Sequence, residues 1–142
     1  MNTYEKDFFA WTQEQSKHLN ARQFAELDIE NLVEEIQAMG RSERRELQSR
    51  LTVLLVHLLK WQFQPTRQGR SWQLTIEEQR DSCLDIIEDN PSLKTQLDAL
   101  ASRAYAHAKI TASKETGLDK TTFPSGCPWS YEQMMDADFL PD

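Results

Sequence analysis

The sequence predicts an all-α protein: an antiparallel bundle of five longer helices, with a short C-terminal helix and an aromatic C-terminal segment wrapped around the bundle. Apolar residues recur at helical spacing through most of the 142 residues. No alternating β-branched run is bounded by hairpin turn residues. With only four glycines and five prolines, the connections between helices are short. A chain of this length closes one hydrophobic core, so we predict a single domain over residues 1–142.

The first two predicted helices precede the basic middle of the chain. Residues 4–19 carry an amphipathic pattern, with apolar and aromatic residues on one side and acidic residues on the other. Residues 29–39 form the second helix, for which Asp28 supplies the N-cap and Gly40 a left-handed C-cap.

The third helix begins at Ser42, runs through Trp61 and stops before Pro65. Residues 51–59 are apolar nearly all round. A helix that is apolar on every side is contacted by neighbours on more than one face, so we predict that the third helix is the central one.

Three further helices follow. Ser71 is the expected N-cap of the fourth helix, and the Asn-Pro-Ser sequence at residues 90–92 closes it and opens the fifth. The fifth helix ends at Gly117, and residues 130–133 form a capping box before the short last helix. We expect the aromatic residues of 123–142 to pack on the bundle, because they would otherwise be exposed.

The sequence contains no signal for a membrane or for export. No apolar run approaches the roughly 20 residues of a membrane-spanning helix, and the first residues form neither a basic nor an apolar signal region. We therefore expect a cytoplasmic protein. Cys83 and Cys127 are far apart and show no CxxC spacing, and we predict that both are reduced, buried thiols.

Motifs of the common enzyme and cofactor classes are missing from the sequence. It contains no glycine-rich phosphate loop, no GxSxG elbow and no HExxH pair. The three histidines, His18, His57 and His107, fall on three different predicted helices, so a histidine metal site would need ligands from distant parts of the chain. We predict no metal and no cofactor.

Charge is distributed unevenly along the chain. The net charge is −7, yet residues 41–80 hold eight basic and four acidic residues, a local charge of +4. Either this segment binds an anion or an acidic partner, or it is a solvated face with ion pairs such as Glu46 with Arg50. The candidate binding residues are Arg41, Arg44, Arg45, Lys60, Arg67, Arg70, Trp72 and Arg80.

Arg50 and His57 are the only candidate catalytic residues. They are seven residues apart and therefore share one helix face, where arginine could stabilise phosphate charge and histidine could transfer a proton. This short spacing resembles the motif of the all-helical HEPN ribonucleases. In the alternative interpretation, which we favour, His57 is a core residue paired with Glu77 across the helix interface, near Arg80.

Short segments spread over most of the chain match the pattern of one known family. They are, in order, residues 7–12, 32–36, 40–47, 57–62 with Pro65, 71–72, 79–80, 90–93, 115–118, 123–124, 127–129 and 138–141. With these segments the chain resembles domain-of-unknown-function family twenty-nine. The resemblance implies an all-helical fold and a bacterial source, since the family is frequent in cyanobacteria and some proteobacteria, and it brings no established activity, substrate or cofactor.

Taken together, these features predict a non-enzymatic protein-interaction module. Its partner would be another protein or a second copy of the chain. We expect no membrane partner, and no nucleic acid unless the chain is a ribonuclease or toxin-like enzyme that uses Arg50 and His57. A small-ligand sensor with a pocket between Trp61 and Trp72 is a third hypothesis, and it rests on composition alone.

Overall fold

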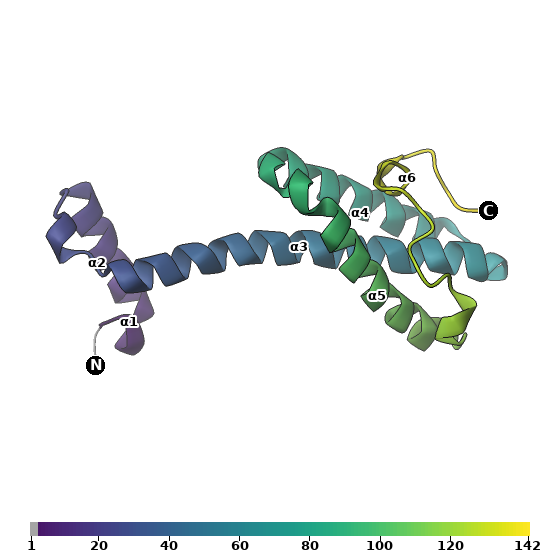
Figure 1. Cartoon of the computed structure of the whole chain (residues 1–142), viewed down its shortest axis with the longest axis horizontal. Coiled ribbons are helices and arrows are strands. Elements are labelled where there is room, and N and C mark those ends of the chain that lie inside the picture. Colours follow the sequence, from purple (N-terminus) through teal and green to yellow (C-terminus); the bar gives the residue numbers. More distant parts are fainter. Residues whose placement is uncertain (1–2) are drawn as a thin grey trace. The chain divides into compact units, whose positions relative to one another are not determined.

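The computed structural model describes residues 3–142, which form six α-helices and four short 3₁₀ helices and contain no strand (Figure 1). The all-α prediction is confirmed. Four longer helices, α2 to α5, take the place of the five that we predicted. The α-helices are α1 (Thr3–Lys6), α2 (Phe8–Asn20), α3 (Ile29–Phe63), α4 (Arg70–Asp89), α5 (Leu97–Thr116) and α6 (Tyr131–Met135); the 3₁₀ helices are Phe24–Glu26, Pro65–Arg67, Pro91–Gln96 and Lys120–Thr122.

The predicted break at Gly40 is wrong, because α3 is one helix of 35 residues. Among the described glycines only Gly117 has a positive φ, so Gly40 is not a left-handed cap. A glycine inside a helix costs about 1 kcal/mol relative to alanine. The strong helix formers that follow it, such as Arg44 and Leu47, continue the helix regardless.

Three other predicted boundaries shift by a few residues. The first helix is divided at Asp7, whose carboxylate accepts a hydrogen bond from the Ala10 backbone N–H (3.0 Å) and caps α2. Helix α4 begins at Arg70, one residue before the predicted cap Ser71. The proline at position 91 opens a 3₁₀ segment, and α5 begins only at Leu97.

Three of the predicted caps are confirmed. The Asp28 carboxylate accepts from the backbone N–H of Asn31 at 3.4 Å, as an N-cap does. Gly117 has φ 78° and ends α5 in the left-handed conformation. Ser130 and Gln133 form the reciprocal capping box at the start of α6.

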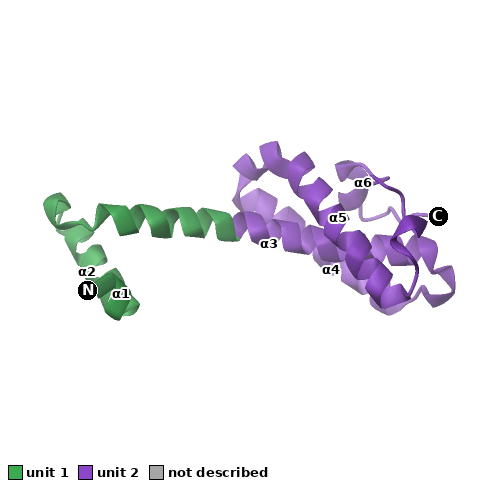
Figure 2. Ribbon diagram, turned by 60° about the horizontal axis from the view of Figure 1, so that its bottom comes forward, with its two compact units in different colours: residues 1–42 green, residues 43–142 purple. Residues whose placement is uncertain are grey.

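The chain divides into two compact units, unit 1 with residues 1–42 and unit 2 with residues 43–142 (Figure 2). Unit 1 holds α1, α2 and the first residues of α3, and unit 2 holds the rest of the chain. The single domain over residues 1–142 stays a prediction. Whether the two units unfold together tests it.

In unit 2 three helices run up, down and up. The Asn90 side chain at the end of α4 lies 3.4 Å from the Glu43 carboxylate, and Gln68 just before α4 donates to the Trp61 carbonyl (2.8 Å). Helix α4 is therefore antiparallel to α3, as Figure 1 also shows. The Gln64 side chain lies 3.5 Å from the carbonyl of Thr116, so α5 ends beside the end of α3.

The hydrophobic core of unit 2 is built around α3. Five leucines of this helix, Leu51, Leu54, Leu55, Leu58 and Leu59, are fully buried. They face α4, α5 and the C-terminal segment in one cluster, which confirms that this helix is the central one. Full burial of each such side chain contributes about 2 kcal/mol to folding.

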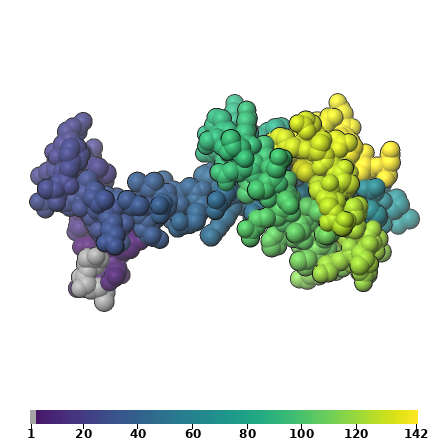
Figure 3. Space-filling view, in the orientation of Figure 1, coloured from purple at the N-terminus to yellow at the C-terminus, as the bar shows by residue number. Residues whose placement is uncertain are grey.

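The C-terminal segment packs on unit 2, as we predicted from its aromatic residues. Phe123 and Trp129 are buried in the core cluster, and Figure 3 shows the segment lying against α5. Arg80 of α4 fixes its far end: the guanidinium donates to the backbone carbonyls of Met134 (2.6 Å), Gln133 (3.3 Å) and Phe139 (2.8 Å).

Candidate functional site

Unit 1 leaves most of its large apolar side chains exposed to water. Trp11 is its only buried apolar residue among residues 3–42, whereas eight large ones are exposed there. By comparison, the hundred residues of unit 2 expose four. The exposed apolar surface of unit 1 consists of Phe8, Phe9, Leu19, Phe24, Ile29, Val33, Ile36 and Met39.

Polar contacts hold α2 against the start of α3. The Trp11 indole donates to the Asp28 carboxylate at 2.9 Å, and the backbone N–H of Asp28 donates to the Gln15 side chain at 2.8 Å. Tyr4 donates its hydroxyl proton to Glu35, and this bond raises the pKa of Tyr4 to about 12. Asp28 accepts from Asn31 and Trp11, and these bonds lower its carboxyl pKa.

These contacts decide which side of α3 faces outward. Asp28 and Glu35 point toward α2 and α1, because their partners lie there. Ile29, Val33 and Ile36 follow one another at spacings of four and three residues and share a different face of the helix. Ile36 is 65% exposed, so this face forms an apolar stripe open to solvent.

The exposed apolar side chains of unit 1, spread over α2, the 3₁₀ helix Phe24–Glu26 and α3, add up to the area that one partner contributes to an interface. Each of the eight side chains is about half to three-quarters exposed, which corresponds to roughly 100 Å² each and roughly 800 Å² together. One partner in a standard protein interface contributes about 800 Å².

Acidic side chains border the stripe. Glu30 and Glu34 lie one residue beyond Ile29 and Val33, about 100° around the helix, and both are exposed. Arg41 approaches Glu34 at 3.9 Å, with side chains 40% and 63% exposed, so the ion pair contributes little to stability. Side chains of residues 1–42 comprise eight acidic and four basic groups, a net charge of −4.

The predicted basic binding residues are divided among different environments. Lys60 forms an ion pair with Glu115 (2.8 Å) and lies 5.5 Å from the centre of the Trp72 ring. Arg80 is 4% exposed and is occupied by backbone carbonyls. The remaining arginines of the candidate set outside unit 1 are exposed; they are Arg44, Arg45, Arg67 and Arg70.

Arg50 and His57 have separate local partners. Arg50 pairs with Glu46 at 2.9 Å, which is the ion pair that we predicted for a solvated face. The His57 Nδ1–H donates to the carbonyl of Val53 (2.9 Å), one turn back in α3. Burial lowers the pKa of His57, and its charged neighbours are Lys60 and Glu115.

The predicted pair of His57 with Glu77 is therefore wrong: the acceptor of the His57 hydrogen bond is the Val53 carbonyl. The level at which two neighbouring helices face each other depends on the turn that joins them, whereas the imidazole forms its bond within its own helix.

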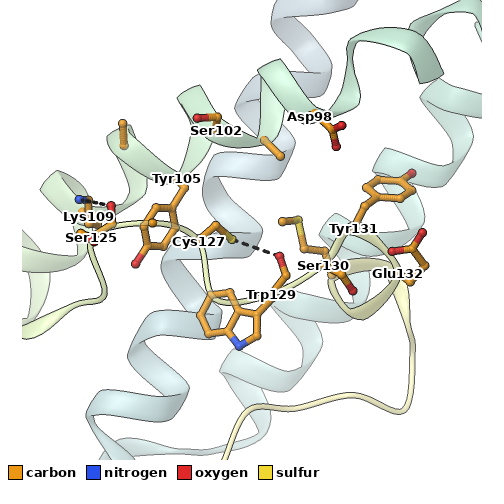
Figure 4. Close-up of a pocket in the computed structure, with 14 residues that line it drawn as sticks. Asp98, Ser102, Tyr105, Lys109, Ser125, Cys127, Trp129, Ser130, Tyr131 and Glu132 are labelled. Carbon is orange, nitrogen blue, oxygen red and sulfur yellow. Dashed lines mark hydrogen bonds between the residues drawn. The ribbon is translucent and has the colours of Figure 1, made fainter.

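Unit 2 has a surface pocket of about 480 Å³ between α5 and the C-terminal segment (Figure 4). Tyr105 and Lys109 of α5 line it and donate to the backbone carbonyls of Pro124 (2.6 Å) and Ser125 (3.1 Å), so these two side chains fasten the segment to α5. Cys127 also lines the pocket, and its thiol lies 3.5 Å from the Trp129 carbonyl within the segment itself. Asp98 and Glu132 lie at the end of the pocket near Tyr131 (Figure 4).

The described residues contain no group of three or more histidine, cysteine, aspartate or glutamate side chains that could hold a metal. Cys83 and Cys127 are free thiols, the first buried and the second half-buried. Burial raises the pKa of Cys83 to about 12 and also raises that of Cys127, so both are poor nucleophiles. None of the helices between residues 3 and 142 combines the length and apolar composition that a membrane crossing needs.

Sequence reasoning missed the apolar surface of unit 1. Apolar periodicity predicts the helix 29–39 but does not show which of its faces is covered. A signal was present: Ile29, Leu32, Val33 and Ile36 form one broad apolar face, of which only Leu32 lies toward α2, where it lines a pocket with Trp11. A single flanking helix covers only one edge of such a face.

Comparison with known protein families gives a match that covers nearly the whole chain. A family model described as Domain of unknown function DUF29 matches residues 3–140. Neither a curated protein nor a solved structure matches the chain.

Proposed function

The chain belongs to the family Domain of unknown function DUF29, which supplies no activity, and from this premise we propose that it is a non-enzymatic protein-interaction module whose partner docks on the apolar surface of unit 1. The imbalance between one buried and eight exposed large apolar side chains in the described part of unit 1 carries the proposal.

Exposed apolar surface on this scale has an energetic consequence. Removing apolar area from water contributes about 25 cal/mol per Å², so covering even half of roughly 800 Å² contributes on the order of 10 kcal/mol before the costs of association. Folding of unit 1 alone gains little free energy from apolar burial, since Trp11 is its only buried apolar side chain among those described. A partner that covers the stripe of Ile29, Val33 and Ile36 stabilises both itself and unit 1.

The test compares two substitutions of exposed isoleucines. Ile36→Glu places a charge in the apolar stripe of unit 1, whereas Ile110→Glu places the same charge on α5 of unit 2, where Ile110 is 55% exposed. A partner captured by the wild-type protein from its source cells is identified, purified and titrated against all three proteins. We expect Ile36→Glu to weaken binding at least tenfold and Ile110→Glu to leave it within twofold of wild type.

Two outcomes contradict the proposal. One is equal binding by the Ile36→Glu and wild-type proteins. The other is a strict monomer by size exclusion with light scattering, together with the absence of any captured partner. Self-association that Ile36→Glu abolishes supports the module with a second copy as the partner.

The ribonuclease alternative stays a prediction. RNA cleavage by the wild type that is lost in a folded His57→Ala protein would place that alternative first. No observation on the surroundings of Arg50 or His57 favours it, since each bonds within its own helix.

A further inference from the structure

We infer that the partner presents an amphipathic helix whose apolar face is bordered by lysine or arginine. This inference rests on the proposed function of unit 1 and identifies the kind of partner that its surface fits.

The shape of the stripe favours a helix. Ile29, Val33 and Ile36 lie along one line of α3, and the next position on that line is Gly40. No heavy atom lies within 4 Å of a Cβ built at Gly40, so a partner can approach the backbone closely there. Rows of residues spaced by three and four are the surface against which a second helix packs.

The charge beside the stripe favours a basic partner. Glu30 and Glu34 are exposed along one edge of it. Arg41 is the nearest basic residue on this helix, and its guanidinium lies 3.9 Å from the Glu34 carboxylate. Among the described residues, no other basic side chain forms an ion pair with Glu34. Lysine or arginine on the flank of a docked helix would reach these carboxylates, as charged flanks do in paired helices.

The same charge disfavours the other occupants. The corresponding surface of a second copy would bring a charge of −4 against −4. Nucleic acid and anionic membranes are negative as well and would be repelled. A basic amphipathic helix satisfies both the apolar and the electrostatic character of the surface.

Two synthetic helical peptides test the inference. Both carry the same leucine stripe, and their flanking positions are all lysine in one peptide and all glutamate in the other. Each is labelled, and its binding to the full-length protein is measured by fluorescence anisotropy. We expect the lysine peptide to bind at least tenfold more tightly than the glutamate peptide and to weaken as salt rises, because exposed charges are screened.

Protein variants assign the effect to the surface. Ile36→Glu should remove binding of the lysine peptide, and Ile110→Glu should not. The double variant Glu30→Lys with Glu34→Lys should reverse the preference between the peptides. Circular dichroism confirms that every variant is folded, so a lost signal reports the surface.

Equal binding of the two peptides, tighter binding of the glutamate peptide, or no binding of either overturns the inference. If a captured partner or a second copy binds the wild type but not Ile36→Glu, the proposed function still holds, although the inference of a basic helix fails. If nothing binds and the protein is a strict monomer, both fail.

Discussion

Arg80 illustrates how a charged residue can become structural. It lies in the basic segment of the sequence, yet its guanidinium is buried and donates to three carbonyls near the end of the chain. Burial lowers its pKa, and the carboxylate of Asp136 opposes that shift. Several donors in one rigid plane suit arginine to this task, which a lysine ammonium cannot perform in the same way.

We expect Arg80→Ala to destabilise the protein by about 2–4 kcal/mol, since it leaves buried carbonyls without donors. Arg80→Lys should recover only part of this loss. The exposed Arg67→Ala is the matched control and should stay within about 0.5 kcal/mol of wild type. Urea unfolding followed by circular dichroism measures all three. A loss at Arg80 no larger than at Arg67 would show that the carbonyl contacts add nothing to stability.

His57 makes stability depend on pH in a defined direction. Its pKa in the folded protein lies below the ordinary value of 6.5, chiefly because burial disfavours the charged ring. The unfolded chain therefore takes up a proton more readily. The contribution of His57 to the free energy of unfolding is therefore complete above pH 6.5. It is lost as the pH falls through the pKa that His57 has in the folded protein.

His57→Gln should accordingly flatten the loss of stability between pH 7 and pH 5. His107→Gln, which replaces an exposed histidine of α5, serves as the control and should follow the wild-type profile. Chemical denaturation at several pH values measures the slopes. Identical slopes for wild type and His57→Gln would contradict the assigned role of burial.

At the scale of elements, two glycines that the sequence predicts as left-handed helix ends behave oppositely. Gly117 has a left-handed φ of 78° and ends α5, whereas Gly40 lies inside α3. Neither would bring a Cβ within 4 Å of another atom. Backbone conformation alone therefore decides what a side chain would cost at each position.

Gly40→Ala should stabilise the protein by about 0.5–1 kcal/mol, and Gly117→Ala should destabilise it by about 1 kcal/mol. Thermal unfolding of both variants beside the wild type measures the difference. The opposite signs make each variant the control for the other. Destabilisation by Gly40→Ala would mean that α3 is interrupted there.

At the scale of the whole molecule, the two units differ in how much core they hold. The buried residues of the described core cluster lie between Leu47 and Met134, whereas unit 1 relies on Trp11, its ring contacts with Tyr4 and Phe8, and a few hydrogen bonds. Segments with few buried apolar contacts open at lower free energy than the core of a protein. Unit 1 is thus the part that a partner would stabilise most.

Native-state hydrogen exchange tests this difference. We expect backbone amides of α2 to open at a free energy several kcal/mol below those of residues 51–59 in α3. A bound partner should raise protection in α2. Equal protection of both segments would instead support the prediction of one domain over the whole chain.

Much of the fold follows from local sequence signals. Helix positions came from apolar periodicity, and the caps at Asp28, Gly117 and Ser130 were recognised because a cap bonds to groups within four residues of itself. The central position of α3 followed from leucines on every side of residues 51–59. The family relation was likewise visible in the sequence and matches residues 3–140.

The candidate site could not be obtained in this way. Ile36 and Leu58 are both apolar helical residues in one helix, yet one is 65% exposed and the other fully buried. Their difference depends on which elements cover each face, and Arg80 likewise finds its acceptors 53 to 59 residues away. The sequence by itself determined the helices and their caps, since those depend on neighbours along the chain; only the tertiary structure decided which apolar face is covered, because burial depends on residues far apart in sequence.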